Sequence, residues 1–141
     1  MIRIENITRS QLAQSEITKQ AVLYKGEAYT FFDEGLTRYV FANKDKTKVI
    51  KILIDEDKYA KDFNQEELDI YNSASDEKKR QLAKTEMNGR IIEQEFCEPI
   101  KFNQRPLTIP QIRFAQSCRN EVGWTADGRL VCFDLSELKK Y

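Results

Sequence analysis

The sequence predicts an α+β fold in which an antiparallel β-sheet is combined with a few helices. Residues 28–54 hold three β-rich segments separated by polar turns, and residues 121–134 hold a second hairpin pattern. Helical patterns lie between these two groups, which is typical of the α+β class. The length of 141 residues suits one domain, so residues 1–141 are expected to form a single unit.

The first expected elements are a helix and a three-stranded meander. The helix covers about residues 10–19, with Ser10 as its N-cap. The meander follows at residues 28–54, where three segments are rich in β-branched and aromatic residues: AYTFF, LTRYVFA and KVIKILI. A Gly-containing turn and a polar run separate them, which predicts antiparallel strands joined by tight turns.

The third segment of the meander is apolar on both faces. Side chains alternate along a strand, so Ile50 and its alternate neighbours share one face. The other face carries Val49, Lys51 and Leu53. A strand of this kind is expected to be covered on both sides, and Lys51 stands out as a charged residue at its centre.

Two helices are expected after the meander. The first covers about residues 57–72. Its apolar stripe at roughly helical spacing consists of Tyr59, Phe63, Ile70 and Tyr71. The second begins at Asp76 with Ser75 as its N-cap, and Gly89 ends that stretch.

The C-terminal part is expected to contain a strand, a short helix and a hairpin. RIIEQEFC at residues 90–97 predicts a strand that enters a Pro-containing loop. Residues 110–117 predict a short helix with proline in its first turn. The hairpin covers residues 121–134 around an Ala-Asp-Gly turn, and a last helical turn is expected at residues 135–141.

The charge balance gives no sign of a nucleic-acid or membrane partner. The chain has 23 basic and 23 acidic residues, whereas binding to phosphate backbones or anionic lipids needs a clustered excess of Lys and Arg. The basic runs at residues 44–48 and 78–80 are short and mixed with acids, as on a solvated face. Neither kind of partner is therefore expected.

The absence of histidine excludes several kinds of chemistry. Ser-His-Asp and Cys-His nucleophiles, histidine bases and most catalytic zinc sites all require it. Cys97, Cys118 and Cys132 lack CxxC spacing and are expected to be reduced, buried thiols. No apolar stretch approaches ~18 residues and no signal-peptide core is present, so a cytoplasmic location is expected.

The meander and the helix after it carry two opposite charges in a distinctive order. The strand sequence Val-Ile-Lys ends at Lys51, and Glu67 lies 16 residues later on the expected helix. Gly35 lies in the first turn of the meander, and Val40 follows it. This order resembles the small lobe of protein kinases, in which a strand lysine pairs with a helix glutamate near a glycine-rich turn.

The second half of the chain extends the resemblance to the kinase cleft floor. The expected strand at residues 90–97 resembles the one that leads into a kinase hinge, where the backbone groups of Glu95 to Cys97 would face an adenine. The stretch from Asn120 to Asp134 resembles that from the catalytic-loop asparagine to the metal-binding aspartate. The resemblance covers residues 28–135 and points to the short kinase-like domains of polyvalent proteins from phages and conjugative elements.

The resemblance implies a nucleotide cleft. Lys51 would supply a fixed cation for the phosphates of ATP, and Glu67 would hold its ammonium group in place. The other residues implied to border the nucleotide are Gly35, Val40, Glu95 and Cys97. Asn120 and Asp134 would hold Mg²⁺, a hard ion that prefers oxygen ligands.

The sequence departs from the kinase pattern where phosphotransfer takes place. No His-Arg-Asp sequence precedes Asn120, and Ala115 stands in the place of the catalytic-loop aspartate. A carboxylate that would accept the proton of an incoming hydroxyl is therefore missing there. The first turn has a single glycine, and a large lobe is not expected. The sequence thus predicts a pared-down kinase-like domain without independent phosphotransfer activity.

Each singled-out residue also has an ordinary structural interpretation. Lys51 would extend along the sheet into solvent, and Glu66 or Glu67 would be surface charges, with Glu66 the alternative partner for the lysine. Asp134 would cap a terminal helix. Asn120 would serve a turn.

Two other functions are open from the sequence. A non-enzymatic protein-interaction module of the phage or mobile-element type would occlude or separate these residues and would expose an apolar patch instead. Metal-dependent hydrolysis by carboxylates alone would use acids such as Glu93 and Glu95, which alternate along one strand. Solvated charges at a sheet edge explain those acids more simply.

Overall fold

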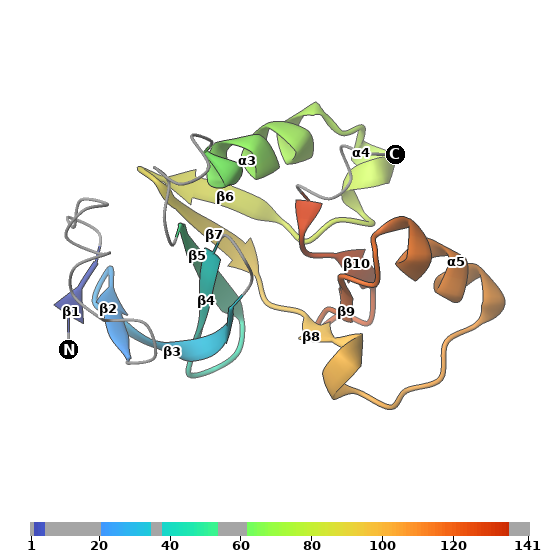
Figure 1. Cartoon of the computed structure of the whole chain (residues 1–141), viewed down its shortest axis with the longest axis horizontal. Helices are drawn as coiled ribbons and strands as arrows, with labels where there is room; N and C mark the ends of the chain where they lie inside the picture. Colours follow the sequence, from blue (N-terminus) through green and yellow to red (C-terminus); the bar gives the residue numbers. More distant parts are fainter. Residues whose placement is uncertain (1, 5–20, 35–37, 54–61, 136–141) are drawn as a thin grey trace.

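The computed structural model describes residues 2–4, 21–34, 38–53 and 62–135. These residues form the predicted α+β fold, with two β-sheets and three α-helices (Figure 1). The helix expected over residues 10–19, the turn glycine Gly35 and the last helical turn expected after Leu135 lie outside the described residues.

The larger sheet has seven strands in the order β1-β2-β3-β4-β5-β7-β6. It is antiparallel except where β1 pairs with β2. Its strands are β1 (Ile2–Arg3), β2 (Val22–Tyr24), β3 (Glu27–Glu34), β4 (Arg38–Asn43), β5 (Lys48–Leu53), β6 (Thr85–Asn88) and β7 (Ile91–Glu95). The predicted meander is confirmed as β3, β4 and β5.

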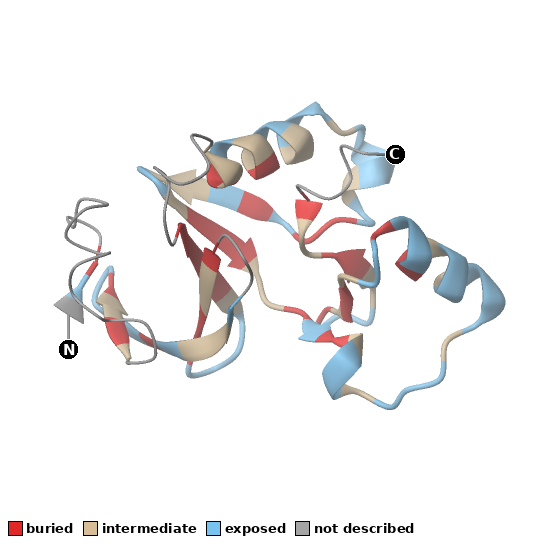
Figure 2. Ribbon diagram, in the orientation of Figure 1, coloured by how far each residue is buried: buried red, intermediate tan, exposed pale blue. Residues whose placement is uncertain are grey.

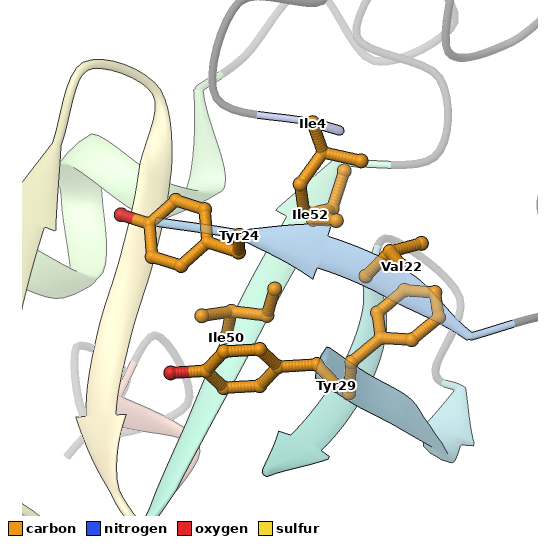
Figure 3. Close-up of a cluster of buried hydrophobic side chains, with 7 residues drawn as sticks. Ile4, Val22, Tyr24, Tyr29, Ile50 and Ile52 are labelled. Atoms are coloured by element: carbon orange, nitrogen blue, oxygen red, sulfur yellow. The ribbon is translucent and has the colours of Figure 1, made fainter. Parts of the chain in front are cut away.

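Strand β5 is buried on both faces, as its sequence predicts. On one face Ile50 lies between the rings of Tyr24 and Tyr29 in the view of Figure 3. The ring centroids of these tyrosines are 5.9 Å apart in an edge-to-face arrangement. On the opposite face Val49 and Lys51 are buried, so a charged side chain occupies a position that burial usually reserves for apolar residues.

The first helix after the meander, α3 (Phe63–Ser73), begins later than predicted. Asp62 has extended backbone angles, and its carboxylate accepts a hydrogen bond from the Gln65 amide, so it caps the helix. Residues 57–61, where the helix was expected to begin, lie outside the described residues. Of the predicted apolar stripe, Tyr59 lies outside the described residues and Phe63, Ile70 and Tyr71 are only half-buried. The buried residues of α3 are the polar Asn64 and Glu67.

The next helix, α4 (Asp76–Lys79), is shorter than predicted. Its N-cap is Ser75, as expected, with the hydroxyl accepting a hydrogen bond from the Lys78 amide. The stretch does not continue as helix to Gly89. Strand β6 intervenes, and Gly89 has a positive φ of 60° in the turn to β7. Pairing of β6 with β7 therefore overrides the local helical pattern.

A smaller three-stranded sheet follows, in the order β10-β9-β8. Its strands are β8 (Glu98–Pro99), β9 (Val122–Trp124) and β10 (Leu130–Cys132). The predicted closing hairpin is confirmed as β9 and β10. Gly123 is needed on β9 because a Cβ there would lie 2.7 Å from the Glu98 carbonyl oxygen, so β8 and β9 approach too closely for a side chain.

Between β8 and β9 the chain forms a 3₁₀ turn, η2 (Ile100–Phe102), and the helix α5 (Ile109–Ser117). The predicted short helix is thus confirmed, and Thr108 and Gln111 form a capping box at its start. Figure 2 shows α5 largely exposed on its outer side, whereas buried residues run along the sheet and the hairpin. A second apolar core lies under α5 and consists of Leu82, Ala115, Cys118, Val122, Cys132 and Leu135.

The three cysteines are buried and form no disulfide, as predicted. Burial raises the pKa of the Cys97 thiol to about 12, so it is not a reactive thiolate at neutral pH.

Within the described part of the chain, no helix has the length and apolar character needed to cross a membrane.

Candidate functional site

Lys51 and Glu67, the two charges singled out in the sequence, form a buried ion pair. The Lys51 Nζ atom lies 3.1 Å from Oε1 and 3.2 Å from Oε2 of Glu67. The two side chains are 4% and 0% exposed. Lys51 therefore does not extend into solvent, and Glu67 rather than Glu66 is its partner.

Glu67 also accepts hydrogen bonds from two other segments of the chain. The Leu135 amide donates to its Oε1 atom at 2.6 Å, and the Arg38 guanidinium donates to its Oε2 atom. Lys51 Nζ donates in addition to the Phe133 carbonyl oxygen. The lysine–glutamate pair thus fastens the end of the C-terminal hairpin to both β5 and α3.

Arg38 on β4 is a central residue of this site that the sequence interpretation missed. One guanidinium nitrogen contacts Glu67 and the other lies 2.8 Å from Asp134 Oδ1. Burial alone would lower the pKa of Arg38, but the charges of Glu67 and Asp134 raise it above its ordinary value. We call Arg38, Lys51, Glu67 and Asp134 the ion cluster; its two positive and two negative charges balance.

Strand register contained the signal for Arg38. Val40 pairs with Lys51 across β4 and β5, and directly paired residues share one face of a sheet. Arg38 lies two residues before Val40 and so occupies the same face. Alternation along LTRYVFA therefore places a guanidinium beside the ammonium of Lys51.

Asn64 is a second missed residue, and it positions α3 over the sheet. Its side-chain amide nitrogen donates to the carbonyl oxygens of Lys51 and Arg90, at 3.0 and 2.8 Å. Its side-chain oxygen accepts from Arg38 at 3.4 Å. Asn64 and Glu67 are three residues apart and share one helical face, so α3 presents an amide and a carboxylate to the strands below.

A narrow cleft lies beside the ion cluster. Its lining residues are Phe32, Asp33, Val40, Val49, Lys51, Gln94, Glu95, Cys97, Pro99 and Phe133. Four residues predicted to border a nucleotide thus line one cleft: Val40, Lys51, Glu95 and Cys97. The cleft encloses about 50 Å³, whereas ligand pockets usually measure several hundred cubic ångströms.

Two residues that line this cleft, Phe32 and Asp33, also contact neighbouring segments. The Phe32 ring lies 5.3 Å from Phe96 and 5.9 Å from Phe102, measured between ring centroids. Lys101 Nζ lies 2.6 Å from Asp33 Oδ2, so η2 is linked to β3. Both charges of this pair are substantially exposed to solvent.

The backbone expected to face an adenine is partly engaged in the sheet. The Glu95 amide donates to the Lys84 carbonyl at 2.8 Å, and the Phe96 amide donates to the Thr47 carbonyl at 3.1 Å. These two amides are therefore engaged within the chain and not available to a ligand. The Glu95 carboxylate is likewise committed, at 2.9 Å from Arg129.

The two residues expected to hold a metal are placed differently from each other. Asp134 belongs to the ion cluster. Asn120 is exposed, with a left-handed φ of 63° and its amide donating to the Ala115 carbonyl, which fits its alternative role in a turn. No hydrogen bond joins its side chain to Asp134 among the described residues, nor do three or more acidic or cysteine side chains there form a metal-binding group.

Glu121 is a further acid near the cleft that the sequence interpretation passed over. It is half-buried, and burial together with the charge of Asp134 raises its pKa above the ordinary value. The positive charges of Lys101 and Lys51 act in the opposite direction. A carboxyl group with a raised pKa next to a cleft is a feature that functional sites often share.

Glu93 and Glu95 do not form a separate acidic centre. Glu93 forms ion pairs with Lys25 at 2.9 Å and with Lys48 at 3.3 Å, and Glu95 forms an ion pair with Arg129. Their interpretation as edge charges is wrong, because β7 lies inside the sheet between β5 and β6.

Comparison with protein-family models and with curated protein sequences gives no match to this chain.

Proposed function

We propose that this chain is a kinase-like domain that binds a nucleotide in the narrow cleft and does not perform phosphotransfer on its own. The observation that carries the proposal is the buried Lys51–Glu67 pair at the wall of that cleft. A strand lysine fixed by a helix glutamate is the arrangement by which protein kinases hold nucleotide phosphates.

The cleft residues divide the work of binding. Lys51 supplies the cation for the phosphates, and Glu67 fixes its position from behind. Val40, Val49 and Phe133 supply apolar walls on which a base would lie. A nucleotide ligand and buried, reduced thiols suit a cytoplasmic protein.

The cleft has to widen to admit a nucleotide, and the contacts between η2 and the lining residues Phe32 and Asp33 permit this. The Asp33–Lys101 pair is solvent-exposed, and exposed pairs contribute only about 0–1 kcal/mol. Phe102 is itself 56% exposed, so moving it away from Phe32 uncovers little additional surface. Opening at η2 leaves the ion cluster undisturbed.

The absence of independent phosphotransfer follows from Ala115. It stands in the place of the catalytic-loop aspartate and is buried in the second core under α5. A methyl group there accepts no proton from an incoming hydroxyl.

Thermal unfolding with and without ATP tests the proposal. ATP at about 100 times its Kd should stabilise the wild type by about 2.7 kcal/mol, a shift of several degrees in Tm. Val40→Phe, which fills the cleft and leaves the ion cluster intact, should abolish the shift, and exposed Lys44→Ala should retain it. No shift in the wild type at millimolar ATP would rule out the nucleotide proposal.

A second candidate function, a protein-interaction module, is favoured by the surface around α5. Phe102, Ile109 and Ile112 are 56%, 66% and 42% exposed. Residues 99–120 contain no acidic residue but four basic ones, in a chain of zero net charge. Apolar side chains in a segment with a local excess of positive charge suit an acidic partner segment with apolar anchors, as in accessory proteins of phages and mobile elements.

An array of acidic, leucine-containing peptides tests this second function. The wild type should bind a subset of them, and the double variant Ile109→Ser, Ile112→Ser should lose that binding. Equal binding by both proteins would exclude the α5 surface as the interface.

A further inference from the structure

We propose that Arg38, beside this cleft, occupies the place that a divalent cation would take between Glu67 and Asp134, so that a nucleotide binds in the cleft without Mg²⁺. The inference rests on the proposed nucleotide function and deepens it. It also departs from the kinase resemblance, which implies Mg²⁺ at Asn120 and Asp134.

The position of Arg38 is the first argument. Its two terminal guanidinium nitrogens contact different carboxylates, Glu67 from α3 and Asp134 from the end of the hairpin. A divalent ion shared by these acids would need the same position. The guanidinium is therefore a bridging cation that belongs to the chain itself.

The state of the carboxylate oxygens is the second argument. Both oxygens of Glu67 already accept hydrogen bonds, from Lys51, Arg38 and the Leu135 amide. Oδ1 of Asp134 accepts from Arg38. Mg²⁺ requires oxygen ligands in a near-octahedral arrangement, so to use these three oxygens it would first have to displace their donors.

The burial of Arg38 is the third argument. The residue is 5% exposed, and an arginine does not lose its proton in a protein. A metal that displaced it would leave a buried cation without its partners, which is strongly unfavourable. A metal that did not displace it would add two positive charges to a cluster whose charges already balance.

Asn120 does not compensate for this loss of ligands. Its side chain makes no hydrogen bond with the ion cluster in the described part of the chain, and it is exposed after α5. The residues present therefore do not fit Mg²⁺. Lys51 remains the cation that lines the cleft and faces a phosphate.

An ATP titration in EDTA and in millimolar MgCl₂ tests the inference. Calorimetry on the wild-type chain should give Kd values that agree within about threefold, a difference well below the 1.4 kcal/mol of a tenfold change. Binding that is more than about tenfold tighter with Mg²⁺ would overturn the inference and leave the nucleotide proposal standing.

Manganese binding to the protein alone gives an independent readout. The electron paramagnetic resonance signal of free Mn²⁺ should persist when wild-type protein is added, and Arg38→Gln should reduce it by releasing Glu67 and Asp134 to the metal. Asp134→Asn is the second variant and keeps the test decisive if Arg38→Gln does not fold. Mn²⁺ binding by the wild type that Asp134→Asn removes would overturn the inference.

The two experiments separate the two proposals. If ATP binds under neither condition, the proposed nucleotide function is wrong, and so is the inference that a nucleotide binds without Mg²⁺. The Mn²⁺ measurement then decides alone whether Arg38 excludes a metal from the two carboxylates.

Discussion

The ion cluster and the α5 surface treat charge in opposite ways. In the ion cluster, three buried side chains from β4, β5 and α3 and the half-buried Asp134 at the hairpin end satisfy one another. Around α5, basic and apolar side chains face solvent, and residues 99–120 themselves contain no acid. The comparison teaches that this chain uses its buried charges to join its own segments, whereas the α5 surface combines exposed apolar side chains with a local excess of positive charge.

Removing the shared acceptor of the ion cluster should give the largest effect. Glu67→Gln leaves the buried cations Arg38 and Lys51 short of a counter-charge, and losing one partner of a buried ion pair costs about 3–5 kcal/mol. Urea unfolding measures the loss. Asp69→Asn on the exposed side of α3 is the matched control and should change stability by less than about 0.5 kcal/mol. Similar losses in both variants would contradict the distinction.

Asn64→Ala should give the next largest effect. The substitution removes the donor to the buried carbonyl oxygen of Lys51 and to the part-buried carbonyl oxygen of Arg90, at a cost of about 1–3 kcal/mol. Urea unfolding again provides the measurement. A loss below about 0.5 kcal/mol would show that water replaces the amide and that Asn64 does not hold α3 in place.

The contributions of Glu121 and Glu93 to folding stability should change with pH in opposite directions. The folded-state pKa of Glu121 is raised, so ionisation costs stability as pH rises above 4.5, and Glu121→Gln should gain on the wild type towards neutral pH. Burial alone would raise the pKa of Glu93, but Lys25 and Lys48 lower it. Its stabilisation is present above pH 4.5 and is lost as pH falls, so Glu93→Gln should be least stable relative to the wild type near neutral pH.

Urea unfolding of both variants at a series of pH values measures these trends. The relevant quantity is the difference in unfolding free energy between each variant and the wild type. Parallel curves for the two variants would refute the opposite environments of these carboxylates.

The α5 surface should give the smallest effect on stability. Ile109 and Ile112 are exposed, so Ile109→Ser with Ile112→Ser should change the unfolding free energy by less than about 0.5 kcal/mol per site. Thermal unfolding of the double variant checks this. A drop of several kilocalories per mole would mean that these side chains belong to the core rather than to a surface for partners.

Local patterns predicted the elements whose pairing partners are close in sequence. The meander and the closing hairpin follow from alternating β-rich segments with turn residues between them, and the resemblance to the kinase small lobe implied the contact between Lys51 and Glu67. Strand β6 was missed because its four residues gain their pairing from β7, which outweighs the local helical pattern.

The polar interior could be predicted less well. Arginine and asparagine usually face solvent. Burial of Arg38 and Asn64 can therefore be predicted only when their polar partners on other segments are known. The engaged amide of Glu95 depends on Lys84, just before β6, and the contact of Asp33 with Lys101 depends on η2, which comes much later in the chain. Contacts of this kind combine several segments, and no single stretch of sequence encodes them.

The hydrogen bond from the Leu135 backbone amide to Glu67 makes hydrogen exchange at this amide a probe of the contact between α3 and the hairpin end. This amide exchanges with solvent only when the carboxylate on α3 withdraws, because its acceptor belongs to that helix rather than to a neighbouring strand. Its exchange rate therefore reports how often α3 and the hairpin end separate, even though no strand pairing breaks. A ligand that binds Lys51 would change how often the two segments separate, because Lys51 shares Glu67 with this amide. The exchange rate of one backbone amide proton would then report ligand binding in the cleft.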